Sequence, residues 1–561
     1  MLKSLRFIVA VLFLLMLVAG VVSAQDEKIL VIGWEQEPPK LSPWADNTFG
    51  SLIDGFVRRD VWDWDVNRDI YPVMVEEVPT LENGGVETLD NGNTRVTVKL
   101  REDLVWSDGE PVTSDDCLIW HEVMIDPTKG AVQRENYPDV VESFEVVDDY
   151  TVTITYNKPW PDYTFDSEVQ CGRLPAHIFR PILEADGNID NAPFGSGEGV
   201  VGYGPYLFDE WTIGSQISLS KNPNWDGEPA KFDKVILRFI TDSAQMLNAL
   251  EAGEVDVTFN WSDDLVDSYS AIEGVEVFKT DGVYGDAVWM NVGNYKGLQE
   301  AHPILGDAKV REAIITAIDR VALAEELVAP GVGVPKSWTP AQFWAEDLPY
   351  WDYDEAKANE LLDEAGWVDT NDNGTRDKDG MELVLRFYTT TRQIRMDYQV
   401  VIQEYLSKVG VGVQLLPIPS NILFASFNDR GILDTGDFDL ALFALSSNPL
   451  SPAFAAPDWF GCGSTPTAEL PTGKNGWGAC SEAFDEADLA VSTTIDPAER
   501  MELAGEAQKA FFDMGFWHGL YLRPTWYAVS TAVVNVDEEV QNLGTLSQNY
   551  FNHVEYWQPA E

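Results

Sequence analysis

The stretch Gly199–Val257 constrains the fold more than any other part of the chain. Two strand-like runs, Gln216–Ser220 and Lys234–Ile240, are separated by a turn-rich Asn-Pro-Asn-Trp-Asp-Gly segment. A helical pattern follows over Ser243–Ala252 and ends at Gly253, the residue type that most often terminates a helix. Strands that lead into a helix in this way predict a unit of an α/β sheet.

The strong negative charge of the chain limits the classes of molecule that it can bind. Its 561 residues are enough for two or more lobes with cores of their own, and they carry 93 acidic against 37 basic side chains. A surface this negative repels nucleic-acid phosphate and anionic lipid. We therefore exclude nucleic acid as a partner, and we interpret the acidity as a device for solubility.

The N-terminus has the pattern of an export signal. Lys3 and Arg6 precede the apolar run Phe7–Val18, which is shorter than the roughly 20 residues that a membrane-spanning helix needs. Val22-Ser23-Ala24 forms a small-residue cleavage site, so we expect a mature chain that begins near Gln25. No cysteine lies near this point, so no lipoprotein anchor is visible. We expect a periplasmic or other extracytoplasmic protein that is either free or held by an uncleaved signal.

The four cysteines predict two disulfides, because an even number in an exported chain is typical of paired thiols. Four cysteines allow three pairings, of which we favour Cys117–Cys171 and Cys462–Cys480. The second would close a short glycine-rich loop, worth about 3 kcal/mol if it is unstrained.

The sequence pattern of the first part of the chain predicts strands joined by turns. Lys28–Trp34 is a continuous apolar run, typical of a buried strand, and Thr94–Leu100 alternates between apolar and polar residues. Glu145–Val147 and Thr151–Tyr156 flank Asp148-Asp149, so we expect them to form a hairpin. Between these strands, Thr113 or Ser114 is placed to begin a helix.

The second part alternates strands and helices, which favours a sheet with mainly parallel strands. Tyr284–Asn291 is an apolar strand that we expect to cross between lobes, and Asp307–Val328 has apolar residues at the spacing of one long helix. The further expected elements are strands at Met381–Tyr388 and Asp437–Leu445 and helices at Tyr353–Ala365, Met396–Val409 and Glu499–Phe512. The chain from Gly519–Ala528 onward is expected to return to the first lobe.

Five segments together resemble one known family. They are 98–124 (containing LVWSDGEPVTSDD), VGYGPY (201–206), KNPNWDGEP (221–229), LNALEAGEVDV (247–257) and VREAIITAIDR (310–320). Their order and spacing resemble the family 5 extracellular solute-binding proteins, the dipeptide- and oligopeptide-binding components of ABC importers. The resemblance implies a two-lobe, periplasmic-binding-protein-like α/β fold with an inserted subdomain in lobe I and a hinged ligand cleft.

The resemblance also implies a division of the chain. We expect a signal peptide at 1–24, lobe I in the segments 25–48, 201–291 and 519–561, an inserted subdomain at 49–200, and lobe II at 292–518. It implies a monomer that captures a solute between the lobes and delivers it to permease subunits, without cofactor and without catalysis.

Two loops of lobe II are expected at the ligand. Arg392 follows the strand that ends at Tyr388, where an arginine of dipeptide-binding relatives holds the peptide carboxylate, because a guanidinium binds a carboxylate through two parallel hydrogen bonds. Peptide binders tend to place an aspartate after the next strand, for the α-amine. Here Ser446–Ser451 contains no acid. A solute with a free N-terminus would therefore lack a counter-ion in this loop.

The chain also has 20 tryptophans, and neutral polar residues beside aromatic rings suit the flat faces and hydroxyls of sugars. We therefore keep an oligosaccharide as the alternative to a peptide-like solute. The candidate ligand-binding residues are Trp34, Gln36, Glu37, Tyr203, Gly204, Trp289, Asn291, Arg392, Phe443, Ser446, Asn448 and Trp459.

The sequence gives less support to metal binding, catalysis or a sensor function. Asp369–Asp377 resembles a calcium loop, but Gly380 stands where a bidentate glutamate is needed, so a plain turn is the favoured reading. The five histidines have no ligand spacing, and we expect no metal. No nucleophile elbow or phosphate loop is present. A secreted carbohydrate-active enzyme remains as a second alternative, because its two carboxylates leave no motif. A sensor subunit that binds solute without transport is the third.

Overall fold

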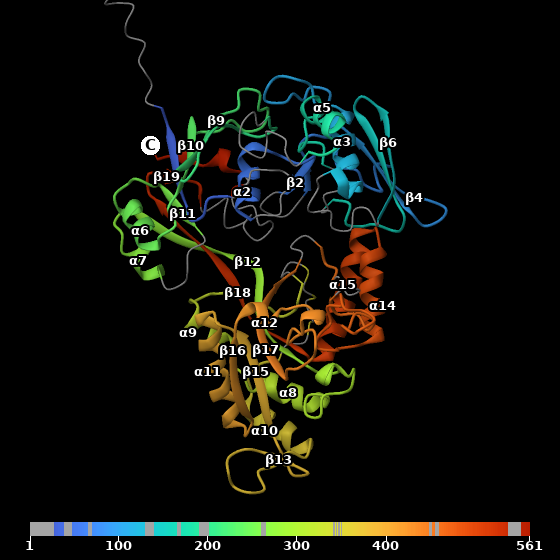
Figure 1. The fold of residues 1–561 in the computed structure, drawn as a ribbon, viewed down its shortest axis with the longest axis vertical. Helices are drawn as coiled ribbons and strands as arrows, with labels where there is room; N and C mark the ends of the chain where they lie inside the picture. The colour runs from blue at the N-terminus through green and yellow to red at the C-terminus, as the bar shows by residue number, and fades with distance from the viewer. Residues whose placement is uncertain are drawn as a thin grey trace, which may run out of the picture.

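The computed structural model describes residues 27–38, 48–64, 70–129, 140–164, 170–189, 201–259, 265–339, 351–447, 451–454, 459–536 and 553–560, with the single residues 343, 345, 348 and 551. The protein has two lobes, one above the other in Figure 1, and two long strands run diagonally between them. The expected signal peptide lies outside the described residues. No helix within these ranges is both long and apolar enough to cross a bilayer.

One sheet runs through both lobes. Ten described strands pair in the order β16-β15-β17-β12-β18-β11-β1-β10-β9-β8. The long strands β12 (Val275–Met290) and β18 (Trp517–Ser530) lie in its middle. The other strands are β1 (Ile29–Trp34), β8 (Tyr206–Thr212), β9 (Gln216–Lys221), β10 (Lys234–Phe239), β11 (Val257–Phe259), β15 (Val384–Thr390), β16 (Gly412–Ile418) and β17 (Leu440–Ser446).

The two crossing strands join the lobes directly. The Phe259 end of β11, in lobe I, pairs with the 527–529 part of β18, and β17, in lobe II, pairs with residues 284–290 of β12. Between these parts, the pairing of β12 with β18 shifts register after Asp281 and again after Asp286. Such bulges bend and twist a strand pair, so the hinge lies in a locally bent piece of sheet. The expected crossing strand at Tyr284–Asn291 is one end of this longer β12.

The whole sheet is mixed: the parallel strands expected in the second part of the chain are confirmed for β15, β16 and β17, but the pairs of β12 and β18 are antiparallel. β1 is parallel to β10 and β11, and β15 is parallel to β16 and β17. The pairs formed by β8, β9 and β10 are antiparallel; a short turn joins β8 to β9, and the longer segment 222–233 joins β9 to β10. The pairs formed by β12 and β18 with each other, and with β11 and β17, are antiparallel as well. Local patterns identify strands, but they do not show that two strands will cross between lobes in opposite directions.

Residues between about 61 and 203 have a core of their own. Strands β4 (Val86–Thr88), β5 (Thr94–Lys99), β7 (Thr151–Tyr156) and β6 (Val141–Asp148) form a separate sheet that helices α3 (Ser114–Ile125) and α5 (Ala176–Asp186) cover. A short hairpin, β2 (Trp62–Trp64) with β3 (Ile70–Pro72), lies beside them. We call this unit the insert. The division of the chain at 49 and 200 stays a prediction.

Two features of the insert were expected from the sequence. Thr113 begins α3 through a capping box, in which Thr113 and Asp116 cap each other's backbone amides. Cys117 on α3 is bonded to Cys171, and in lobe II Cys462 is bonded to Cys480. Both favoured disulfides are confirmed.

The helices of lobe II largely follow their predicted positions, with one correction. The expected single helix at Asp307–Val328 is two helices, α8 (Ala308–Thr316) and α9 (Arg320–Leu327). Asp319 interrupts it, because its side chain accepts a hydrogen bond from the Ala322 amide and so starts a new helix. The remaining helices of both lobes are α2 (Thr48–Val57), α6 (Ser243–Glu251), α7 (Val266–Ser270), α10 (Glu355–Glu364), α11 (Gln393–Lys408), α12 (Ser420–Leu423), α14 (Glu482–Thr493) and α15 (Pro497–Met514).

Short strand pairs complete the described structure: β13 (Asp377–Lys378) with β14 (Met381–Glu382), and β19 (Val533–Val534) with β20 (Gln558–Pro559). The candidate calcium loop precedes β13. The Asp369 carboxylate there accepts hydrogen bonds from the amides of Asn373 and Gly374, and Thr370 donates to Asp377. These carboxylates are used by the turn itself. Within the described ranges, no three His, Cys, Asp or Glu side chains gather to hold a metal.

Candidate functional site

The carboxyl edge of the lobe II sheet lies at the hinge. The parallel strands β15 and β17 end there, at Thr390 and Ser446, and Tyr284 of β12 pairs with Ser446. In α/β sheets, ligands bind beyond the carboxyl ends of parallel strands, where backbone groups and loop side chains are free to reach them. This edge is therefore the candidate functional site.

A buried aspartate organises this edge. Asp286 of β12 is fully buried, and its two carboxylate oxygens accept hydrogen bonds from Arg395 Nε at 2.8 Å and from Arg523 Nε at 2.7 Å. Arg395 lies in the first turn of α11 and is itself buried, whereas the Arg523 side chain on β18 is 29% exposed. We call these three residues the hinge cluster, because they join both crossing strands to a helix of lobe II.

The electrostatics of the hinge cluster favour a charged Asp286. Burial raises the pKa of its carboxyl, but Arg523 and Arg395 outweigh burial, so the pKa lies below its ordinary value. Burial and the neighbouring Asp286 carboxylate raise the pKa of Tyr521, which therefore stays neutral. Two arginines against one carboxylate leave one net positive charge.

Arg392 adds a second positive charge beside the cluster. It occupies the position just before α11, its side chain is exposed, and it is close enough for its charge to oppose part of the rise in the pKa of Tyr521. Arg523 also lies over the exposed ring of Tyr284, with its guanidinium carbon 5.7 Å from the ring centre. The site thus offers two partly exposed guanidiniums and a phenol ring. This arrangement suits an anionic group with an apolar neighbour.

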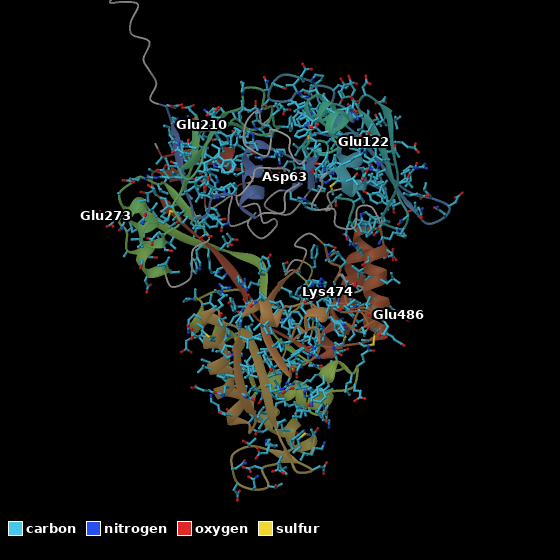
Figure 2. All side chains as sticks on the ribbon, viewed as in Figure 1. Asp63, Glu122, Glu210, Glu273, Lys474 and Glu486 are labelled. Atoms are coloured by element: carbon cyan, nitrogen blue, oxygen red, sulfur yellow. A yellow bond between two sulfur atoms is a disulfide. The ribbon has the colours of Figure 1, made fainter. Side chains whose placement is uncertain are left out.

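The local charge contrasts with the rest of the surface. The exposed Glu210 and Glu273 lie on lobe I and the exposed Glu486 on lobe II, as Figure 2 shows, and the whole chain carries a net charge of −56. A positive spot within such a field would hold an anion by short contacts with the guanidiniums rather than by the field of the whole protein.

On lobe I, the residues after β1 lie at the corresponding edge. Gln36 is exposed, and Glu37 accepts hydrogen bonds from the Trp211 indole and from the Gly214 amide, both at 2.8 Å. Glu37 therefore fixes its loop to the turn between β8 and β9. Trp34, in contrast, is completely buried and stacks on Phe551 with 5.2 Å between ring centres.

Tyr203 and Gly204 lie at the opposite end of β8 from Glu37. They precede the start of β8, whereas Glu37 contacts its far end, and seven extended residues span roughly 20 Å. A Cβ on Gly204 would lie 2.5 Å from the Arg58 amide nitrogen, so a glycine is required where this segment passes the end of α2. The expected close approach is thus to the protein's own backbone.

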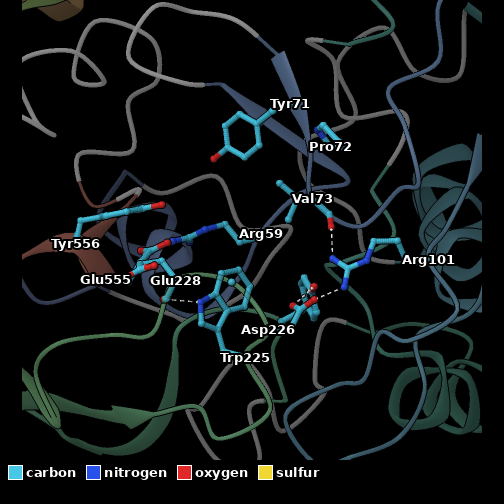
Figure 3. Close-up of a pocket in the computed structure, with 12 residues that line it drawn as sticks. Arg59, Tyr71, Pro72, Val73, Arg101, Trp225, Asp226, Glu228, Glu555 and Tyr556 are labelled. Carbon is cyan, nitrogen blue, oxygen red and sulfur yellow. Dashed lines mark hydrogen bonds and ion pairs between the residues drawn. The ribbon is translucent and has the colours of Figure 1, made fainter.

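Tyr203 lines a pocket of about 160 Å³ at this outer end, shown in Figure 3. Its charged walls are paired with each other: Arg59 binds Glu555 at 2.6 Å, and Arg101 and the Tyr203 hydroxyl both donate to Asp226. These contacts join α2, the insert and the C-terminal residues. The charged side chains of this pocket therefore hold parts of the protein together, and they lie away from the hinge.

The aromatic candidates of lobe II form a core. Trp289 is completely buried, stacks on Trp477 at 4.7 Å and Phe443 at 5.3 Å, and donates its indole N–H to the Phe443 carbonyl. Asn291 is buried as well and donates to the carbonyls of Gly436 and Phe438. In this structure the aromatic rings pack on one another and the Asn291 amide binds backbone groups, so these side chains are used within lobe II.

The remaining candidates divide between the edge and its surroundings. Ser446 is exposed at the end of β17, Trp459 is half-buried beneath Lys474, and Asn448 lies outside the described residues. Of the twelve candidates, the structure thus brings Arg392 and Ser446 to the candidate site in exposed positions, with Gln36 on the facing lobe. Contact of any of the twelve with solute stays a prediction.

The sequence reasoning missed Asp286, Arg395 and Arg523. Each interrupts or borders an apolar run: Asp286 within the strand 284–291, and Arg523 before Pro524 within the last long strand. A charged residue inside an apolar strand is the signal that could have identified them, since buried charges need partners. The pairing of Asp286 with Arg523 depends on the register between β12 and β18, which cannot be predicted from the local sequence pattern.

Comparison with known proteins agrees with this architecture. The family model described as "Bacterial extracellular solute-binding proteins, family 5 Middle" matches residues 69–467. The oligopeptide-binding protein AppA of Bacillus subtilis is 28% identical over 354 residues. That match covers 61% of this chain and 62% of the relative, so it extends over just under two thirds of the relative's length.

Solved structures share the whole fold. The AppA structure from Bacillus subtilis, in complex with a nonapeptide, has a TM-score of 0.65 at 20% identity and covers 95% of this chain and 100% of its own. NikZ from Campylobacter jejuni, in complex with Ni(L-His), has a TM-score of 0.68 at 21% identity and covers 94% of this chain and 99% of its own. At these identities the likeness concerns the fold alone.

Proposed function

Because the chain belongs to the family 5 bacterial extracellular solute-binding proteins, we propose that it captures a peptide-like solute and delivers it to the permease of an ABC importer. A relative named for oligopeptide binding supports the peptide class. In this proposal the protein works as a monomer outside the cytoplasm and releases the solute unchanged.

The observation that carries the proposal is the group of guanidiniums at the carboxyl edge of lobe II. Arg392 is exposed and Arg523 partly exposed, and Asp286 holds Arg523 in place. A carboxylate is the anion that a peptide always offers at its C-terminus. A solute that binds there and also touches lobe I stabilises the closed form, by no more than its differential affinity for that form.

The oligosaccharide alternative rested on aromatic side chains available for stacking. Trp34, Trp289 and Phe443 are each buried to at least 98% in core contacts. These rings therefore supply no argument for a sugar, and no second function is favoured by the described residues. Oligosaccharides serve as the comparison arm of the test.

The test is a thermal-shift and calorimetric screen of the purified protein with defined nonapeptides. One series has a free C-terminus, a second is C-terminally amidated, a third is N-acetylated, and a fourth arm contains oligosaccharides. Binding to the native state raises stability by RT ln(1 + [L]/Kd), about 2.7 kcal/mol at a hundredfold excess over Kd. We expect free-carboxylate peptides to raise Tm, and amidation to weaken binding by roughly tenfold or more.

Arg392→Gln should reproduce the effect of amidation. The matched control is Lys408→Gln, which removes one positive charge from the other end of the same helix, α11. A shift with sugars and none with peptides would contradict the proposal, and so would chemical change of a bound peptide detected by mass spectrometry. We expect N-acetylated and free-amine peptides to bind equally well, because the loop Ser446–Ser451 contains no acidic residue that could pair with the peptide amine.

A further inference from the structure

We propose that Arg500 is a positioning residue for solute capture, because it fastens lobe II to the insert on the side of the molecule away from the hinge. Arg500 lies on α15 and donates to Asp162 Oδ1 of the insert at 2.6 Å. Ser451, the last residue of the predicted ligand loop, donates to Asp162 Oδ2 at 3.2 Å and accepts from Arg500 at 3.2 Å. We call Asp162, Ser451 and Arg500 the latch.

The latch joins two parts of the protein with separate cores. Asp162 follows β7, between Trp160 and Tyr163, which pack in or against the core of the insert. Arg500 belongs to α15, whose apolar face packs in lobe II. In Figure 1 the upper ends of α14 and α15 lie next to the insert, while β12 and β18 cross on the other side. A contact at this distance from the crossing strands is made or broken when the lobes rotate about them.

Arg500 is braced so that its position depends on the end of α14. Its Nε donates to the Val491 carbonyl at 2.9 Å, and its side chain is only 7% exposed. Ile495, between α14 and α15, packs against the core of the insert. The helix pair, rather than a loose side chain, therefore presents the guanidinium to Asp162.

The segment after β17 is tied to the same helix pair. Asp488 of α14 accepts a hydrogen bond from the Phe454 amide at 2.6 Å, and Asp485 accepts one from the Cys462 amide at 3.1 Å. Ser451, at the start of this segment, is buried against Arg500. Formation of the latch therefore sets the position of Ser451, five residues after Ser446 at the candidate solute site.

The chemistry of the latch gives it a moderate strength. A charge-assisted hydrogen bond that is mostly shielded from water is stronger than a surface ion pair, but Asp162 keeps 19% of its side chain exposed. Such a contact can shift an equilibrium between open and closed lobes without deciding whether the protein folds. The purpose of the latch rests on the proposed capture function, whereas its existence can be tested without solute.

The test measures the distance between the lobes in the purified protein. The described cysteines are all in disulfides, so thiols introduced by Val147→Cys on β6 and Leu489→Cys on α14 can be labelled selectively. These side chains are 60% and 62% exposed, so the substitutions disturb no core. Spin labels there report the distance distribution by double electron–electron resonance, without and with a free-carboxylate nonapeptide.

We expect a dominant short distance in the parent protein and a roughly tenfold lower ratio of closed to open molecules in Arg500→Gln. Asp162→Ala should have the same effect, and the double variant should be no more open than either single variant, because one contact is lost in all three. Nonapeptide dissociation should accelerate by a similar factor. The control is Arg180→Gln, which breaks ion pairs to Asp115 and Glu122 inside the insert and should leave the distances unchanged.

An unchanged distance distribution in Arg500→Gln would overturn the proposal. Additive effects of the two substitutions, or a parent protein without the short distance, would overturn it as well. Absence of nonapeptide binding combined with the expected distance changes would reject the peptide as solute and leave the latch in place.

Discussion

The hinge cluster and the latch are built from the same chemical groups and differ in burial. Asp286 is fully buried and held by the two arginines Arg395 and Arg523, whereas Asp162 is 19% exposed and held by one arginine, Arg500, and by the Ser451 hydroxyl. The hinge cluster ties two neighbouring strands of one continuous sheet to a helix of lobe II. The latch ties two separate cores. Burial therefore suits the first contact to stability and the second to a conformational equilibrium.

The largest expected effect is that of Asp286→Ala. It leaves two arginines without their carboxylate in a buried place, and breaking a buried ion pair in this way costs about 3–5 kcal/mol. Asp162→Ala, its counterpart at the latch, should cost at most about 1 kcal/mol in the free energy of unfolding. Chemical denaturation of both variants checks the comparison. Equal losses would show that burial is not what separates the two sites.

A smaller difference is expected within the hinge cluster. Arg395→Gln should lower the free energy of unfolding by about 2–3 kcal/mol, because its side chain is 8% exposed and it also donates to Thr390. Arg523→Gln should cost only about 1 kcal/mol, because water partly replaces its contact with Asp286. Peptide affinity should show the reverse order, because Arg523 is the arginine that solvent reaches. A greater loss of stability in Arg523→Gln would contradict this ranking.

The pH dependence of stability adds a third aspartate to the comparison, Asp439 of lobe II. Hydrogen bonds from His302 and Arg386 outweigh the effect of burial and lower its pKa to about 2. Because the folded pKa lies below the unfolded one, this stabilisation is complete above about pH 4 and disappears as the pH falls through about 2. It amounts to about 2 kcal/mol. Asp439→Asn should flatten the pH dependence of stability in that range, and an unchanged slope would assign the acid sensitivity to other carboxyls.

The local elements were largely predictable from the sequence, since they depend on neighbouring residues. The patterns at Gln216–Ser220 and Ser243–Ala252 correspond within one residue to β9 and α6. The break at Asp319 was missed although aspartate is a common helix start, because the apolar spacing continues through it. The mixed sheet was missed for a different reason. Strand direction is settled by the route of the chain between lobes.

The candidate site was predictable only in part. Arg392 and Arg395 are three residues apart, and the sequence does not reveal that one is exposed while the other is buried against Asp286. Asp286 and Arg523 are separated by 237 positions and meet because of the register between β12 and β18. The latch likewise joins residues 338 positions apart. Such contacts depend on tertiary geometry, which short-range patterns do not encode.

The route of the chain through the sheet has a consequence for synthesis. In lobe I, β11 lies between β1 and β18, and Arg59 is paired with Glu555, 496 positions later. Lobe I therefore lacks an inner strand until residues 517–530 emerge, and one partner of a buried ion pair until Glu555 emerges. Lobe II has all its strands except β18 much earlier. The half that begins first is thus finished last, and a chain cut short near its end would present an unpaired β11 edge to neighbouring molecules.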